Sequence, residues 1–291
     1  MAGIRLEFAQ FGDFDSFDVI RSLSSMVGVA NIDLPSPIVT GLTTMYYVDT
    51  TVSEDTTYYY KIRVWRGANS VVSNEIKCFA GAYIAKILAD HPIAYYPMNE
   101  ESGGFAFDIT SNPVNGTIFD CAMGQAALSR RLGKCYYFDG SSRIELGSPS
   151  KFSIASSVSL ECWMKPTVLG GNTVQIGFNS GLRMQIGSAA NMIFSGANKL
   201  SSSPILTINT LYHIVFTCTA SELKIYINGV LAGSIAGGGW SGIGSVANSA
   251  IGYAGAGHGE YFTGYMSNIA LYNYALTAEQ VSEHYNVGIA A

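Results

Sequence analysis

The acidic side chains are the first candidates for bond-breaking chemistry in this chain. Hydrolysis of a glycosidic bond needs two carboxylates about 5–10 Å apart, so on one face of a β-strand they would recur at every second or fourth position. Glu161 lies within a clear strand pattern, but neither residue two positions away is acidic. Glu100 and Glu101 are adjacent, so they would point in opposite directions. The spacing therefore predicts no glycosidase site.

Other catalytic groups are no better supported. The histidines stand apart from one another in the sequence: His91, His213, His258 and His284. We expect His213 to be a hydrogen-bonded strand residue and His284 to lie on a helix face. No Gly-x-Ser-x-Gly motif marks a hydrolase nucleophile. The glycine-rich stretch GYAGAGHG lacks the strand-to-helix context of a phosphate-binding loop. The sequence predicts a protein that is not an enzyme.

The cysteines give no framework for disulfides or for zinc. There are five of them: Cys78, Cys121, Cys135, Cys162 and Cys218. An odd number without a CxxC pair fits neither arrangement. Cys162 and Cys218 fall on apolar strand faces, so we expect both to be small core residues. The chain is expected to fold in a reducing cytoplasm.

Composition and charge narrow the possible partners. Hydrophobic residues make up 48 % of the 291 positions and charged residues 13 %, about half the usual share of charge. Such a surface is covered by small polar residues or partly hidden in a homo-oligomer, and we expect both. The net charge of −5, without a long basic run, argues against nucleic acid. No signal peptide and no apolar stretch of about 18 residues is visible, which predicts no membrane insertion.

The hairpin pattern in residues 212–232, YHIVFTCTASELKIYINGVLA, predicts β-structure with a defined register. Ile214 and Phe216 share one face of the first strand, and Leu223, Ile225 and Ile227 share one face of the second. The Asn228-Gly229 pair tolerates positive φ, which is typical of a tight turn. Lys224 and Tyr226 point the other way on the second strand, as a half-buried antiparallel strand requires, and the hairpin predicts an all-β fold.

Short alternating runs also fill the first 80 residues. Tyr58, Tyr60, Ile62 and Val64 fall on one face of a strand that follows a turn at residues 53–56. The hydroxyl of Tyr58 could hydrogen-bond back to that corner, as in the tyrosine corner of β-sandwiches. Together with the motif Ser73-Asn74-Glu75, this segment resembles a fibronectin type III domain, which we assign to residues 1–80.

A short helix is expected between the two β-rich parts. Tyr83 with Ile87, and Ile84 with Leu88, are i, i+4 apolar pairs. We assign residues 81–93 to this helical joint and expect it to set the orientation of the two domains.

A series of landmarks follows from residue 94 to residue 291. They read AYYPMNEESGG, AFDITSNPVNG, YYFDGSSRIEL, SVSLECWMKP, the hairpin above, and IGYAGAGHGEYFTGYMSNIALYNYALTAEQVSEHYNVG. In this order they resemble a laminin-G-like, concanavalin A-like jelly-roll sandwich. In the last landmark, Thr277 and Gln280 form a capping-box pattern for a helix that would bury Val281 and Tyr285 and end near Gly288.

The resemblance implies a calcium ion at the rim of the sheets. Asp108 matches the family's metal-binding Asp, with oxygens from Thr110 and Asn112 beside it. A second acid usually follows near the end of the domain, where this chain has Ser267 and Asn268. Asn268 could compensate in part. Alternatively, Asp108 accepts hydrogen bonds from its own turn.

The resemblance also implies carbohydrate or protein binding, which uses exposed aromatic rings and nearby polar groups. Trp240 lies in the glycine-rich stretch GGGWSG and could contact a ligand or simply pack. Tyr253, His258 and Tyr261 lie in a second glycine-rich stretch. They either bind a ligand or simply form part of a loop. Trp163 is expected to serve packing.

Chains with this pair of domains resemble virion proteins of tailed bacteriophages. The implied function is a non-enzymatic decoration or tail adhesion protein that contacts other virion proteins and a host cell-surface glycan. Alternatives are a bacterial surface or secreted carbohydrate-binding module, or an auxiliary module of a glycanase complex.

Overall fold

Antiparallel sheets dominate the structure, which confirms the all-β class predicted from the sequence. The computed structural model describes residues 4–155, 157–170, 173–177, 182–195, 199–236, 249–254 and 259–290. The chain divides into two units, residues 1–85 and 86–291. Within the described residues, no helix has the length and apolar character needed to cross a membrane.

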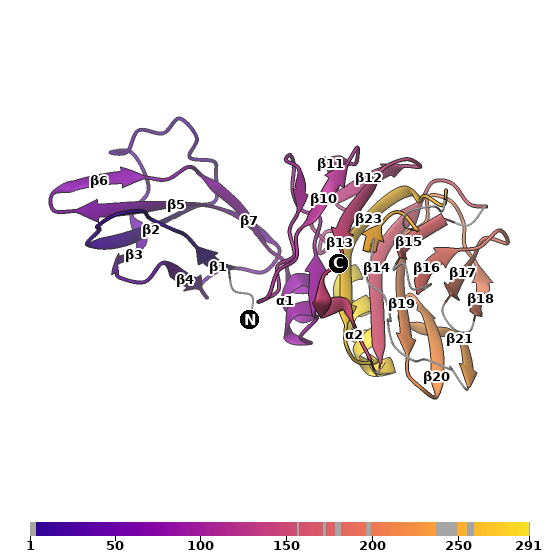
Figure 1. Ribbon diagram of the computed structural model, residues 1–291. Helices are drawn as coiled ribbons and strands as arrows, with labels where there is room; N and C mark the ends of the chain where they lie inside the picture. The colour runs from indigo at the N-terminus through magenta and orange to yellow at the C-terminus, as the bar shows by residue number, and fades with distance from the viewer. Residues whose placement is uncertain are drawn as a thin grey trace. The chain divides into compact units, whose positions relative to one another are not determined.

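The N-terminal unit consists of two sheets that share one core (Figure 1). A two-stranded sheet joins β1 (Ile4–Glu7) to β4 (Tyr46–Asp49), and a second sheet has the order β3-β2-β5-β6, with β7 also paired to β5. The strands of this second sheet are β2 (Ser16–Ser22), β3 (Pro37–Leu42), β5 (Thr56–Arg66), β6 (Asn69–Val72) and β7 (Ile76–Ala80). Apolar side chains of both sheets, including Leu6, Phe17 and Ile62, form its hydrophobic cluster.

The predicted facing of β5 is confirmed. Tyr58, Tyr60 and Ile62 are buried, whereas the residues between them are partly exposed. The backbone N–H of Ser53 donates to the Tyr58 hydroxyl at 2.8 Å, so the tyrosine closes the corner that precedes its strand. The wider resemblance to fibronectin type III domains stays a prediction.

The helix expected between the β-rich parts is also present. It is α1 (Ala82–Ala89), and it is followed by His91 with a positive φ of 51°. The i, i+4 residues Tyr83 and Ile87 are both fully buried, as the apolar pairing indicated. Its expected influence on the orientation of the domains stays a prediction.

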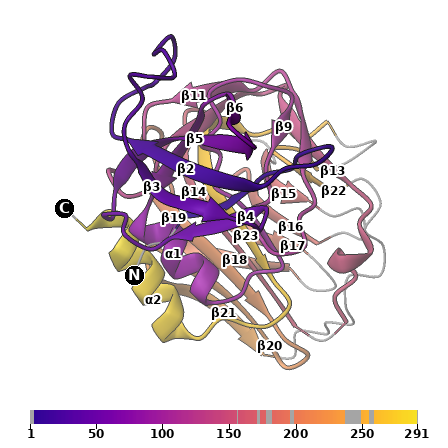
Figure 2. The ribbon, with the colours of Figure 1, turned by 90° about the vertical axis from the view of Figure 1, so that its left-hand side faces the viewer.

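The C-terminal unit consists of two larger antiparallel sheets (Figures 1 and 2). The first has the order β18-β17-β16-β15-β22-β13-β10-β9, and the second β11-β12-β23-β14-β19-β20-β21 with β8 paired to β23. The first sheet contains β9 (Phe105–Ala106), β10 (Gly116–Phe119), β13 (Arg143–Gly147), β15 (Thr173–Gly177), β16 (Arg183–Ile186), β17 (Asn191–Ser195), β18 (Lys199–Ile205) and β22 (Ser249–Ile251). The second contains β8 (Ala94–Tyr96), β11 (Ala122–Gln125), β12 (Cys135–Asp139), β14 (Val158–Pro166), β19 (Tyr212–Cys218), β20 (Glu222–Ile227), β21 (Val230–Ala236) and β23 (Thr263–Tyr272). A 3-10 turn, η1 (Ser150–Phe152), precedes β14.

The core of this unit lies between its two sheets. Its cluster combines Ile144 and Ile251 from one sheet with Leu160, Ile214 and Phe216 from the other. The hairpin register predicted from the sequence is confirmed: Ile214 lies opposite Ile227, and Phe216 opposite Ile225. Both turn residues, Asn228 and Gly229, have positive φ. Cys162 and Cys218 are buried free thiols in the same core, also as expected.

The half-buried pattern predicted for the second strand of the hairpin holds in part on β20, where Lys224 is partly exposed but Tyr226 is buried. Every residue of β19 is buried. On the face that points away from the core, His213 of β19 lies against α2 (Ala278–Ile289), where its ring stacks on Tyr285 with centroids 6.2 Å apart. Thr277 and Gln280 form the predicted capping box at the start of α2. Trp163 packs beneath the helix, where its ring stacks on Tyr285 with centroids 5.9 Å apart.

Candidate functional site

The candidate site begins with one face of the first sheet. On β13, Ile144 and Leu146 enter the core, so Arg143 and Glu145 must point outward. Residues paired across antiparallel strands share a face. Glu145 is paired with Thr117 on β10 and with Ala250 on β22, and Arg143 is paired with Phe119. The outer face therefore combines an ion pair with an aromatic ring and small neighbours.

A tyrosine pair forms a second wall beside this face. Tyr253 and Tyr261 are joined by an isolated antiparallel bridge that follows β22. Their rings stack with centroids 4.5 Å apart and an interplanar angle of 19°. Next to the bridge, the backbone N–H of Phe262 donates to the carbonyl of Gly252 at 2.9 Å. This backbone pairing holds both rings in place.

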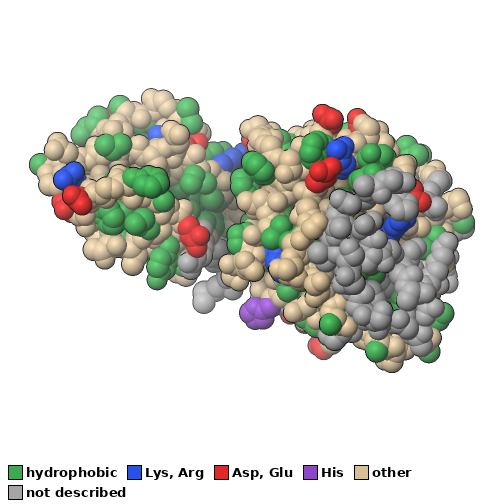
Figure 3. Space-filling view, viewed as in Figure 1, with side chains coloured by type: hydrophobic (Ala, Val, Ile, Leu, Met, Phe, Trp, Pro, Cys, Tyr) green, Lys and Arg blue, Asp and Glu red, His purple; other side chains and the backbone are tan. Residues whose placement is uncertain are grey.

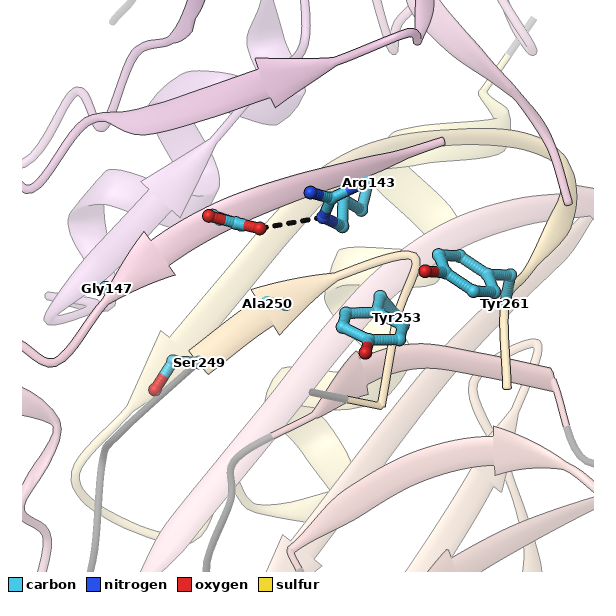
Figure 4. Close-up of a pocket in the computed structure, with 7 residues that line it drawn as sticks. Arg143, Gly147, Ser249, Ala250, Tyr253 and Tyr261 are labelled. Atoms are coloured by element: carbon cyan, nitrogen blue, oxygen red, sulfur yellow. Dashed lines mark hydrogen bonds and ion pairs between the residues drawn. The ribbon is translucent and has the colours of Figure 1, made fainter. Parts of the chain in front are cut away.

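The two walls enclose a pocket of about 330 Å³ (Figure 4). Its lining residues are Arg143, Glu145, Gly147, Ser249, Ala250, Tyr253 and Tyr261. Ser249 and Ala250 on β22 are small, which leaves room between the ion pair and the tyrosine rings. The opening could take one or two sugar rings, since small-ligand pockets begin near this size.

The ion pair gives the pocket its electrostatic character. Nε of Arg143 donates to Oε1 of Glu145 at 2.7 Å, and the guanidinium carbon lies 4.2 Å from the centroid of the Phe119 ring. The hydrogen bond to Glu145 raises the pKa of Arg143, with further contributions from Tyr261 and Tyr253. Arginine is therefore charged, and its charge is balanced by a carboxylate in contact with it.

The structure brings together part of the predicted ligand-binding set. Tyr253 and Tyr261 meet in the pocket, whereas Trp240 and His258 lie outside the described residues. The sequence reasoning missed Arg143 and Glu145. Their signal was the alternation in Ser-Arg-Ile-Glu-Leu, which places both on the polar side of a strand.

The residues predicted to bind calcium have other partners. Asp108 accepts hydrogen bonds from the backbone N–H groups of Tyr95, Thr110 and Val114. Its Oδ2 also lies 2.6 Å from the ammonium of Lys151, which donates to the carbonyl of Asn112 as well. The carboxylate therefore already receives four donors, about as many as it can accept.

Asn268, the remaining predicted ligand, is equally engaged. It is fully buried on β23, where Nδ2 donates to the carbonyl of Leu132 at 2.9 Å and Oδ1 accepts from the Tyr95 hydroxyl. The surroundings of Asp108 therefore do not fit a calcium ion, because the ammonium group of Lys151 occupies the place that the cation would take. Whether the chain binds calcium stays a prediction, with a test given below.

A second group of charged residues lies beneath α2. Glu161 on β14 contacts His213 Nε2 at 2.8 Å and His284 Nδ1 at 3.0 Å, and it accepts from the Tyr272 hydroxyl at 3.0 Å. The other nitrogen of His284 lies 2.8 Å from Oδ2 of Asp90. This buried cluster of Glu161, His213, His284, Asp90 and Tyr272 joins β14, β19, β23 and α2 with the segment that follows α1.

The charges in the buried cluster stabilise one another. Burial disfavours the charged form of His284, but Glu161 and Asp90 outweigh it and raise its pKa to about 9. Burial alone would raise the pKa of Glu161, yet both histidines hold it well below its ordinary value. Burial dominates for His213, whose pKa is lowered. Glu161, His213 and His284 are each 0 % exposed, so no substrate reaches them in the folded protein.

The predictions for His213 and His284 are therefore confirmed in part. His213 is a strand residue bonded to Glu161, and His284 lies on α2. The side chain of His284 faces inward, and its ion pairs with Glu161 and Asp90 were not predicted.

Comparison with known proteins agrees with this architecture. Residues 138–282 match the family described as the concanavalin A-like lectin/glucanases superfamily. The C-terminal unit therefore contains a laminin-G-like, concanavalin A-like jelly-roll domain. No curated protein matches the chain.

Solved structures show the same fold. Domain 4 of AbnA, a GH43 extracellular arabinanase from Geobacillus stearothermophilus in complex with arabinotriose, has a TM-score of 0.52 and 21 % identity, covering 66 % of this chain and 97 % of that domain. The binding domain of Paraclostridial Mosquitocidal Protein 1 has a TM-score of 0.52 and 17 % identity, covering 68 % of this chain and 52 % of that one. The botulinum neurotoxin serotype D ligand-binding domain in complex with N-acetylneuraminic acid has a TM-score of 0.51 and 16 % identity, covering 70 % and 52 %. The chain thus spans about half of each toxin domain.

Proposed function

We propose that this chain is a non-enzymatic adhesion protein that binds a glycan through the pocket of its jelly-roll domain. The observation that carries the proposal is the joining of the stacked Tyr253–Tyr261 rings with the Arg143–Glu145 pair around one pocket. Aromatic rings provide apolar contact for a sugar face, and the polar pair provides directed hydrogen bonds to hydroxyl groups. The arabinanase domain, a fold relative, was solved with arabinotriose.

The absence of catalysis is part of the proposal. Among the described residues that line the pocket, Glu145 is the single carboxylate, whereas glycoside hydrolysis needs two. Glu145 is also held by Arg143, whose Nε lies 2.7 Å from its Oε1. Incubation with natural and chromogenic glycans should release no product, and product release would overturn this part.

For the biological setting, we propose a virion decoration or tail adhesion protein of a bacteriophage. The support is the resemblance of the N-terminal strands to fibronectin type III modules, together with a surface poor in charge. Figure 3 shows few charged side chains on the described part of this face of the C-terminal unit. In a homo-oligomeric array, several weak sites would act together and give high avidity.

A glycan array combined with virion proteomics tests the proposal. We expect selective binding to a group of glycans, binding about tenfold weaker in Tyr261→Ala, and recovery of this chain from purified particles. The variant Trp240→Ala shows whether Trp240 contributes to glycan binding. Failure to bind any glycan would overturn the binding function, and absence from particles would overturn the virion setting.

One observation favours a second candidate, an auxiliary module of a glycanase complex. The arabinanase domain is matched over 97 % of its length. Size-exclusion chromatography with light scattering separates the two, because the virion proposal requires a defined oligomer and a module appended to an enzyme is expected to be monomeric.

A further inference from the structure

The charge balance of the pocket indicates which glycans it can hold. This inference rests on the proposed binding function and adds the class of ligand. We infer that the pocket selects uncharged saccharides and discriminates against sugars that carry a carboxylate, with Glu145 as the residue that determines this specificity.

The first support is the geometry of the ion pair. Arg143 uses Nε for Glu145 and the face of its guanidinium for Phe119. Within the described residues, the Nη groups of Arg143 and Oε2 of Glu145 have no hydrogen-bond partner. The pair therefore presents donors directly beside an acceptor.

That arrangement suits neighbouring hydroxyl groups. A hydroxyl both donates and accepts, so adjacent hydroxyls of one sugar can bond to Arg143 and Glu145 together. A carboxylate only accepts. It could bond to Arg143, but it would then lie close to the negative charge of Glu145, and this repulsion offsets the attraction.

The second support is that the described lining of the pocket holds no second positive charge that could compensate for Glu145. Arg183, which lies near the tyrosine bridge, is held by Glu260 at 2.7 Å. Among the described residues that line the pocket, Arg143 is the single cation and Glu145 the single carboxylate. The charges around the pocket are therefore balanced, which favours a neutral ligand.

Glu145→Gln tests this inference because it removes the negative charge and keeps the shape. Binding is measured on an array that carries neutral oligosaccharides beside carboxylate-bearing counterparts, such as lactose beside sialyllactose and methyl-esterified beside free oligogalacturonides. The unmodified protein should prefer the neutral member of each pair. Glu145→Gln should raise affinity for the acidic member about fivefold at low ionic strength, and the gain should vanish near 1 M salt, where the Debye length is ~3 Å.

Glu222→Gln is the matched control. Glu222 lies 2.7 Å from Lys224, also two residues away on one strand, so the substitution changes net charge equally at a distant position. Its glycan preference should equal that of the unmodified protein. A preference for acidic sugars in the unmodified protein, or equal shifts in the two variants, would overturn the inference while the binding function stands. Binding to no glycan would overturn the proposed function and this inference with it.

Discussion

The buried cluster under α2 and the pocket on the opposite sheet use similar residues in different surroundings. Each contains a glutamate that contacts a cationic or cation-forming side chain, with aromatic rings stacked nearby. Glu161 is 0 % exposed and bonded to three side chains, whereas the Glu145 side chain is 47 % exposed and bonded to one. Burial therefore makes the first group a stabilising element, and exposure leaves the second free to bind.

Substitution of the two glutamates should give the largest contrast. Glu161→Leu leaves His284 and its partners buried without their shared carboxylate, so the free energy of unfolding should fall by about 3–5 kcal/mol. Glu145→Leu, on the surface, should change it by less than about 1 kcal/mol. Urea unfolding followed by fluorescence measures both. Equal losses of unfolding free energy in the two variants would show that burial does not make Glu161 more stabilising than Glu145.

The pH dependence of stability separates the sites next. The pKa of His284 is raised from 6.5 to about 9 in the folded protein. Its contribution is therefore complete below pH 6.5 and lost as the pH rises through 9, a change of about 3 kcal/mol at 1.36 kcal/mol per pKa unit. His213 has a lowered pKa and is neutral throughout this window. Urea unfolding at several values between pH 6.5 and 9 should show the decline.

His284→Gln should remove that slope, whereas His91→Asn should retain it, because His91 is exposed and asparagine tolerates its positive φ. At low pH the lowered pKa of Glu161 gives the opposite dependence. Its contribution is present above 4.5 and declines as the pH falls through its folded value. A slope that persists in His284→Gln would assign it to another group.

The ion pair of Lys151 with Asp108 is intermediate between the buried cluster and the exposed pocket. The Lys151 side chain is 13 % exposed, and the Asp108 side chain is fully buried. We expect equal Tm values for the unmodified protein in EDTA and in excess calcium. Lys151→Ser should lose about 1–2 kcal/mol and then recover part of it with calcium, since a ligand of the folded state raises stability. Lys134→Ser, at an exposed pair with Glu101, should show no calcium response. A calcium-dependent Tm in the unmodified protein would confirm the calcium prediction.

Tyr261→Ala should have the smallest effect on stability and a selective effect on binding. Loss of one stacking face should weaken glycan affinity about tenfold with little change in Tm. Tyr137→Ala is the control, because Tyr137 belongs to another aromatic pair, with Tyr265 at 5.0 Å, on the second sheet. Isothermal titration with a glycan identified on the array measures both. Equal weakening in the two variants would place the ligand elsewhere.

Local patterns were sufficient to predict the elements of the fold. Asn228-Gly229 specified its turn, and Thr277 with Gln280 specified a helix start, because each depends on residues a few positions apart. The burial of β19 on both faces could not be predicted in the same way. It depends on α2, which begins 60 positions after the strand ends.

The candidate site was predictable only in part for the same reason. The aromatic residues Tyr253 and Tyr261 were visible as a type, and the polarity of Arg143 and Glu145 was visible in their strand. What joins them is the pairing of β13 with β22, two strands separated by about 100 residues. No local pattern specifies that contact, and the same holds for Glu161 with His284.

The position of β23 has a consequence for biosynthesis. This strand lies between β12 and β14 in the second sheet, although both are made more than 95 residues earlier. A nascent polypeptide that has not yet emerged from the ribosome beyond residue 272 holds two incomplete half-sheets with open edges, which are prone to mispairing. The jelly roll must therefore complete its folding late, after nearly all of its residues have been translated.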